Sequence, residues 1–160
     1  MAITSPYRSL PSARRVALVT HAMTSSRDVR LLYIQRLVSR GGGFRAVTLQ
    51  SWPVDRLARE IVRMNAETAQ DELDLLQMLY LEVQPEIQAT FLDAAGVRHE
   101  GGKRSEELEP PYADAEAVRR GAVAVRERHG EEGERYLRTL LRYSREGWPG
   151  IEDVVAQLDG

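Results

Sequence analysis

The sequence predicts a mainly α fold that forms a single multi-helix domain over residues 1–160. Apolar residues recur at helical spacing through most of the chain, and capping or stop residues stand where this periodicity begins and ends. The length of 160 residues allows a core that needs no covalent staple. An apolar share of 42% and a charged share of 29% are typical of globular proteins and exclude the fibrous and membrane classes.

Two helices carry clear signals at both ends. Ser26 is a favoured N-cap for a helix that runs to about Arg40, where the glycines 41–43 stop it. Asp114 caps a second helix that runs to about His129, with Gly130 as its stop. Further helices are expected after Pro53, over 67–81, from Pro85 to about Gly96, from Glu131 through Leu141 and through Val154 to Leu158.

Two segments are ambiguous. Residues 15–21 and 44–50 are rich in residues that favour strands, but Val16, Val19 and Met23 also fit a helical stripe. The sequence leaves open whether these segments are strands or helix and loop. If they are strands, a small two-strand β element lies in the N-terminal third, and two strands alone make a poor sheet.

Charge divides the chain into three parts: an N-terminal arm at 1–13, a basic α or α/β part at 14–64, and an acidic helical part at 65–160. Residues 1–64 carry eleven arginines against three acidic side chains, a net charge of +8. The remainder carries a net charge of −10. Such asymmetry indicates either a face for nucleic acid or an acidic partner, or two parts that attract each other within or between subunits.

Several chemistries are excluded or unsupported. The chain has no cysteine, so disulfides and cysteine-based metal sites are excluded. His21, His99 and His129 lie in different segments without the spacing that places two ligands on one helical face. We therefore expect no metal site and no cofactor. The apolar run from Val16 to Met23 is too short for a membrane span, which leads us to expect a soluble, cytoplasmic protein with no membrane partner.

The basic part contains a candidate nucleic-acid or partner-binding set, supported by the nearby aromatic side chains of Tyr33 and Trp52. Its members are Arg27, Arg30, Arg36, Arg40, Arg56, Arg59 and Arg63. A second basic stripe, Arg135, Arg138, Arg142 and Arg145, follows one edge of a later helix. The competing interpretation is that these arginines dock on acidic helices of the same chain or of a neighbouring subunit.

The longest loop, from Val97 to Pro111, is the candidate functional loop. Its His99 and Glu100 suggest an enzyme alternative, in which they form a site with residues from the acidic helices. Because no nucleophile motif or phosphate loop accompanies them, we expect a non-catalytic protein.

The interpretation that the sequence favours is a helical protein that acts through protein–protein interaction or self-assembly, as a homo-oligomer or with a protein partner. Three features suggest self-association: the small-residue face of the 114–129 helix, the edge of a two-strand sheet, and the opposite charges of the two parts. Nucleic-acid binding or regulation through the basic part, and an enzyme around His99 and Glu100, are the alternatives.

Overall fold

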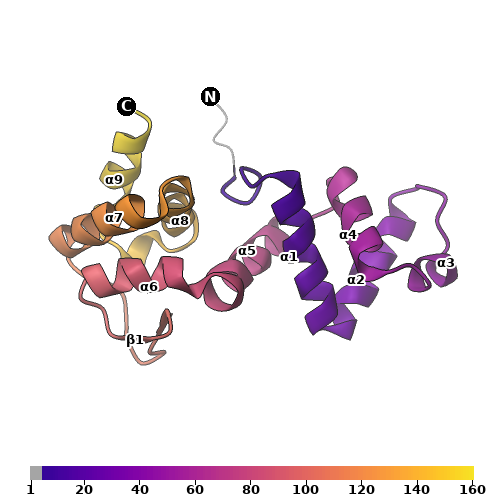
Figure 1. The fold of residues 1–160 in the computed structure, drawn as a ribbon, viewed down its shortest axis with the longest axis horizontal. Coiled ribbons are helices and arrows are strands. Elements are labelled where there is room, and N and C mark those ends of the chain that lie inside the picture. The colour runs from indigo at the N-terminus through magenta and orange to yellow at the C-terminus, as the bar shows by residue number, and fades with distance from the viewer. Residues whose placement is uncertain (1–4) are drawn as a thin grey trace. The chain divides into compact units, whose positions relative to one another are not determined.

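The computed structural model describes residues 5–160, which form a mainly α structure (Figure 1). Its helices are α1 (Ser12–Ser25), α2 (Arg27–Ser39), α3 (Ala46–Gln50), α4 (Val54–Arg63), α5 (Ala69–Met78), α6 (Pro85–Ala94), α7 (Ala115–His129), α8 (Glu131–Tyr143) and α9 (Ile151–Leu158). A π-helical turn, η1 (Leu79–Val83), a 3₁₀ turn, η2 (Arg145–Gly147), and a hairpin of β1 (His99–Glu100) and β2 (Lys103–Arg104) complete the described structure. The predicted fold class is confirmed.

The chain divides into two compact units. The N-terminal unit is Tyr7–Met78, and the C-terminal unit is Leu79–Gly160 together with Ser5 and Pro6. The boundary lies inside the part that the charge pattern defines as acidic. As a result, the N-terminal unit combines the arginines of the basic part with the first carboxylates of the acidic part.

The predicted caps are where the sequence places them. The Ser26 hydroxyl accepts a hydrogen bond from the backbone N–H of Val29 at 3.3 Å. The Asp114 carboxylate accepts from the backbone N–H of Ala117 at 2.8 Å. Gly130, with a φ of +57°, ends α7 in a conformation that a side chain disfavours. Local chemistry therefore fixes the bounds of these helices.

The β element does not lie in the N-terminal third. Residues 15–21 belong to α1, in which Leu18, Val19 and Met23 are buried at helical spacing, and residues 46–50 form α3. A lone pair of strands would expose its edges, whereas a helix satisfies its own backbone hydrogen bonds. The two-strand hairpin is instead β1–β2, in which His99 pairs with Arg104 and Glu100 with Lys103.

In the N-terminal unit, α1 packs against α2, α4 and α5 (Figure 1). The residues that we describe as an arm contribute to this core, because Tyr7 and Leu10 are buried; residues 1–4 of the arm lie outside the described range. The other fully buried aliphatic side chains include Val19, Leu37, Leu49, Ala58 and Ile61.

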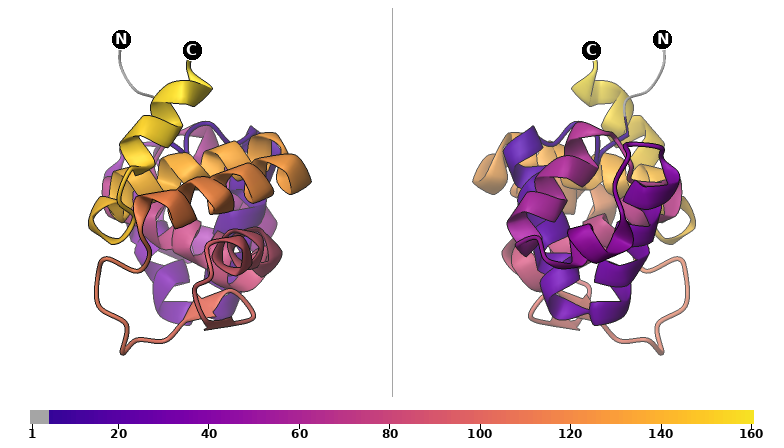
Figure 2. Two further views of the ribbon diagram at one scale, coloured as in Figure 1. Left: turned by 90° about the vertical axis from the view of Figure 1, so that its left-hand side faces the viewer. Right: turned by 90° about the vertical axis from the view of Figure 1, so that its right-hand side faces the viewer.

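In the C-terminal unit, α7 lies on α6, and α8 runs back beside α7 (Figure 2). The crossing of α6 and α7 depends on Gly121, where an added Cβ would lie 2.8 Å from the Phe91 ring. Phe91 contacts Trp148 and Tyr136 edge to face, with ring centroids 5.0 and 5.5 Å apart. This aromatic cluster is the centre of the unit.

The small-residue face of the 114–129 helix is therefore covered by α6 of the same chain. Of the three features that suggest self-association, this face and the sheet edge are not available to a second subunit. The density of large apolar side chains from Leu73 to Phe91 predicts that this run lies in the core. Leu76, Leu79 and Phe91 are fully buried, and the boundary between the two units falls inside the run.

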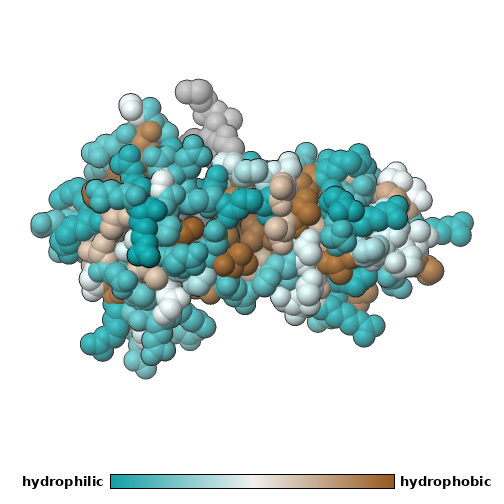
Figure 3. Space-filling view, in the orientation of Figure 1, coloured by the Kyte–Doolittle hydropathy of each residue, from teal (hydrophilic) through white to brown (hydrophobic). Residues whose placement is uncertain are grey.

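The face of the molecule drawn in Figure 3 is mostly hydrophilic, with hydrophobic residues in small separate patches. Within residues 5–160, no helix is both long enough and apolar enough to cross a membrane.

Candidate interaction surfaces

Most of the predicted nucleic-acid set is already engaged inside the N-terminal unit. Arg36 pairs with Asp71 of α5, Arg59 pairs with Asp55 at 2.8 Å, and Arg63 pairs with Glu60. Arg30 donates to the backbone carbonyls of Gln50 and Trp52 at 3.3 and 3.1 Å. The Arg56 guanidinium lies 3.8 Å from the centroid of the Trp52 ring.

Arg27 and Arg40 differ from the other five, because within the described residues their exposed side chains form no hydrogen bond, ion pair or aromatic contact. The seven side chains therefore do not form one free basic face. One face of the Trp52 ring is occupied by Arg56, and its edge is in T-shaped contact with Phe44, 5.3 Å away. This ring is not free on both sides for base stacking.

The two units also differ in a feature that the sequence interpretation missed, a buried carboxylate at Glu67. The side chain of Glu67 is fully buried between α4 and α5. Arg15 of α1 donates to its Oε2 at 2.9 Å, and the Tyr7 hydroxyl donates to the same atom at 2.6 Å. Burial and the hydrogen bond to Glu67 raise the pKa of the Tyr7 phenol well above its usual value.

Further contacts close this cluster. Arg8 donates to the backbone carbonyl of Glu67 at 2.8 Å, and Arg8 and Arg15 both donate to the side-chain oxygen of Asn65 at 3.1 Å. Asn65, at the end of α4, has a φ of +49°, a conformation in which asparagine is enriched. The cluster connects the N-terminal residues to the turn between α4 and α5, so we interpret its role as structural.

The sequence holds only part of the signal for this cluster. Thr68 and Asp71 form a reciprocal cap at the start of α5, in which the N–H of Thr68 donates to Asp71 at 2.8 Å and the N–H of Asp71 donates to Thr68 at 3.1 Å. Their spacing is that of a capping box and is readable in the sequence. The pairing of Glu67 with Arg15 is not, because 52 residues separate them.

The predicted functional loop folds back on α6. The Nδ1 atom of His99 accepts a hydrogen bond from the backbone N–H of Gly102 at 2.9 Å, so Nε2 carries the proton that bonds to Asp93 at 2.6 Å. Glu100 is exposed. Both ring nitrogens of His99 are occupied, one of them by Asp93 of α6.

Through these two hydrogen bonds, His99 connects the β1–β2 hairpin to α6. The enzyme alternative remains a prediction. In the described part of the chain, no three His, Cys, Asp or Glu side chains are grouped in a way that could hold a metal ion.

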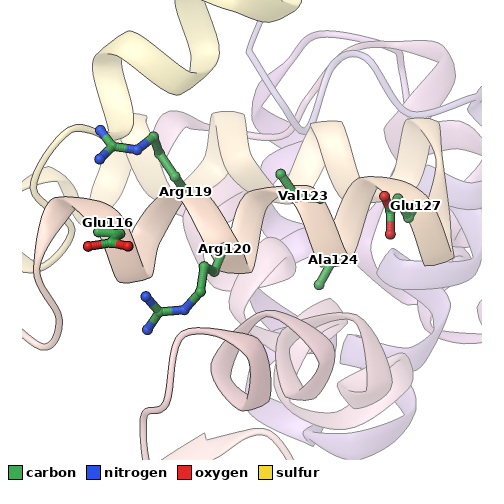
Figure 4. A pocket seen from close by; sticks show the side chains of 6 residues that line it. All are labelled: Glu116, Arg119, Arg120, Val123, Ala124 and Glu127. Atoms are coloured by element: carbon green, nitrogen blue, oxygen red, sulfur yellow. The ribbon is translucent and has the colours of Figure 1, made fainter.

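The outer face of α7 carries a shallow hollow (Figure 4). Its floor is Val123 and Ala124, and Arg119 and Arg120 point to opposite sides of the helix (Figure 4). Arg120 also donates to the backbone carbonyl of Ala94, at 3.4 Å. Because all of the lining comes from one helix, this hollow is an exposed helix face and not a cleft between elements.

The largest hollow that we describe lies in the C-terminal unit between α8 and α9, and we call it the α8–α9 groove. Its volume is about 590 Å³, and its apolar lining includes Leu141, Val155 and Ala156. Its charged lining comprises Arg138, Arg142 and Arg145 from α8 and the turn after it, and Glu152 and Asp159 from α9 and its end. Three arginines of the second basic stripe, Arg138, Arg142 and Arg145, line this groove. The stripe is visible in the sequence, whereas the groove is not.

The members of this stripe differ in their partners. Arg135 pairs with Glu132, and Arg138 pairs with Asp159, each at 2.8 Å. Arg142 lies 5.7 Å from the ring centroid of the adjacent Tyr143, and within the described residues neither Arg142 nor Arg145 forms an ion pair with a carboxylate. The groove therefore combines exposed apolar surface with two uncompensated guanidinium groups.

Comparison with family models, with curated proteins and with solved structures finds no match for this chain.

Proposed function

We propose that this protein is non-catalytic and acts by self-association, with the α8–α9 groove as its contact surface. The observation that carries the proposal is the combination in one groove of apolar lining and two arginines without carboxylate partners. A polypeptide segment with both apolar and acidic side chains satisfies both features at once, because it covers the apolar surface and pairs with the guanidinium groups. Arginine is also enriched in the cores of protein interfaces.

The alternative functions have less support in the geometry. Nucleic-acid binding by the seven predicted arginines would compete with the contacts that Arg30, Arg36, Arg56, Arg59 and Arg63 make inside the chain. An acid–base role for His99 would require the release of one of its two hydrogen bonds. The proposed contact needs no such rearrangement, because the groove is open within residues 5–160.

The test is sedimentation equilibrium of the full chain from about 10 μM to about 1 mM, a range that spans weak dissociation constants. We expect a mass that rises with concentration. The Ala156→Arg variant places a long cationic side chain in the groove, and arginine keeps a high helix propensity at this exposed position of α9. We expect this variant to raise the dissociation constant about tenfold or more.

The matched control is Val123→Arg, which introduces the same side chain on the exposed face of α7. We expect this control to associate as the unmodified chain does. A strictly monomeric mass at all concentrations would overturn the proposal, and so would an equal effect of the two substitutions.

A further inference from the structure

The loop between β2 and α7 exposes an acidic segment. Residues 105–111 read Ser-Glu-Glu-Leu-Glu-Pro-Pro. Glu106, Glu107 and Glu109 are exposed, and none of them forms an ion pair within the described residues. Leu108 lies between them and keeps 40% of its surface exposed. This segment therefore offers carboxylates and one apolar side chain together, which complement the two arginines and the apolar lining of the α8–α9 groove.

Both ends of the segment are fixed in the C-terminal unit. Before it, the guanidinium of Arg104 lies 3.8 Å from the centroid of the Tyr112 ring. After it, the backbone N–H of Tyr112 donates to the carbonyl of Gly147 at 2.9 Å. The Tyr112 ring also packs against Trp148, with centroids 5.2 Å apart. Because these contacts restrain both ends of the segment, it loses less conformational entropy when it binds.

The segment and the groove share one face of the unit. A second hollow of about 490 Å³ is lined by Pro110 and Tyr112 from the segment side and by Arg142 and Arg145 from the groove side. The two arginines therefore border both hollows. In a dimer with two-fold symmetry, each copy must present donor and acceptor surfaces on the same face. This unit meets that condition.

We infer that residues 105–111 of a second copy occupy the α8–α9 groove, and that the exchange is reciprocal. The glutamates of the segment pair with Arg142 and Arg145, while Leu108 covers the apolar lining at Leu141 and Ala156. This inference rests on the proposed function and names the partner at that surface. A second copy fits because the segment makes no ion pair with the two arginines of its own chain.

The negative charges that face the groove set the orientation of the bound segment. Glu152 and Asp159 line the groove from the α9 side, and Asp159 is already paired with Arg138. A segment docked with its carboxylates toward Glu152 would place like charges together, which costs free energy at an interface. The glutamates of the second copy therefore face α8.

The test is a charge exchange in the full-length protein. One variant, Arg142→Glu with Arg145→Glu, reverses the groove, and another, Glu106→Arg with Glu107→Arg and Glu109→Arg, reverses the segment. All five side chains are exposed, so thermal unfolding should show both variants folded. We expect each variant alone to lose most of its self-association. An equimolar mixture should recover it, because the reversed groove of one copy meets the reversed segment of the other.

The control is Arg119→Glu with Arg120→Glu on the outer face of α7, which changes the net charge by the same amount as the groove variant and should associate normally. Recovery in the mixture supports the inference. If the groove variants weaken association but the segment variant does not, the groove is the contact surface and the segment is not its occupant. If neither the groove nor the segment variant changes association, both the inference and the proposed function are wrong.

Discussion

The two units of this protein reach a buried core by different means. In the N-terminal unit, a fully buried carboxylate, Glu67, holds Tyr7 and Arg15 and so fastens α1 to the turn between α4 and α5. In the C-terminal unit, the helices are held together by the close packing of Phe91, Tyr136 and Trp148 and by glycines at the helix crossings. The first unit therefore depends on charge compensation, and the second depends on volume and shape.

The largest expected effect comes from removing the buried charge while keeping its shape. Glu67→Gln leaves the guanidinium of Arg15 buried without a carboxylate, and breaking such a pair costs about 3–5 kcal/mol of unfolding free energy. Chemical denaturation measures the cost. Hydrogen exchange should show the loss of protection within residues 7–78 and little change within residues 79–160.

The control for this substitution is Asp55→Asn, which neutralises the carboxylate of an exposed pair with Arg59 in the same unit. A cost below about 1 kcal/mol is expected there, because solvent screens exposed pairs. Equal costs for the two amide substitutions, or a loss of protection spread over both units, would contradict the contrast between the units.

A smaller effect is expected at the crossing of α7 and α8. An added Cβ at Gly133 would collide with the backbone carbonyl group of Val125, which cannot move aside as a flexible side chain can. Although alanine is the better helix former, Gly133→Ala should therefore destabilise the protein by about 1–3 kcal/mol, measured by denaturation.

The reverse substitution, alanine to glycine, in the N-terminal unit measures the effect of helix propensity without a close helix crossing. At Ala17, an exposed position of α1, glycine should cost up to about 1 kcal/mol through helix propensity alone. Alanine is therefore expected to lower the stability of the protein relative to glycine at position 133 and to raise it at position 17. If Gly133→Ala instead stabilises the protein, the crossing is looser than the geometry indicates.

The smallest expected effects should be alike in the two units. Ser26→Ala and Asp114→Ala each remove one capping hydrogen bond, the first in the N-terminal unit and the second in the C-terminal unit. Each should cost about 1 kcal/mol in thermal unfolding, because capping is a local interaction that does not depend on the type of core. A difference well above that value would show that one cap also supports its unit in another way.

What the sequence predicts correctly is local. Ser26 and Asp114 mark helix starts, and Gly130 marks a helix end, because each satisfies or releases backbone groups of its own neighbours in the chain. The ambiguous segment 15–21 is helical because its apolar side chains find their partners on α4 and α5, which are distant in sequence. Neither residue propensity nor spacing contains that information.

The candidate site follows the same division. The stripe of Arg135, Arg138, Arg142 and Arg145 is visible in the sequence as helical spacing. Which of these arginines lack carboxylates is decided by the position of Asp159 and by the short-range pairing of Glu132, and the groove itself exists only once α9 lies beside α8. The small-residue face of α7 shows the opposite case, in which a correct pattern suggests the wrong partner, because α6 of the same chain covers it.

The buried carboxylate also bears on the order in which the chain acquires structure during synthesis. The first 64 residues contain eleven arginines and three acidic side chains. Glu67 follows them; its carboxylate pairs with Arg15 and accepts a hydrogen bond from the Tyr7 hydroxyl. Until that residue has left the ribosome, α1 has no charged partner for its buried guanidinium and no α5 to pack on. Closing this contact joins positions 60 residues apart, an entropy cost that precedes any gain from the core. The nascent N-terminal unit therefore stays an unneutralised, arginine-rich polypeptide until it is nearly complete, and then folds as a whole.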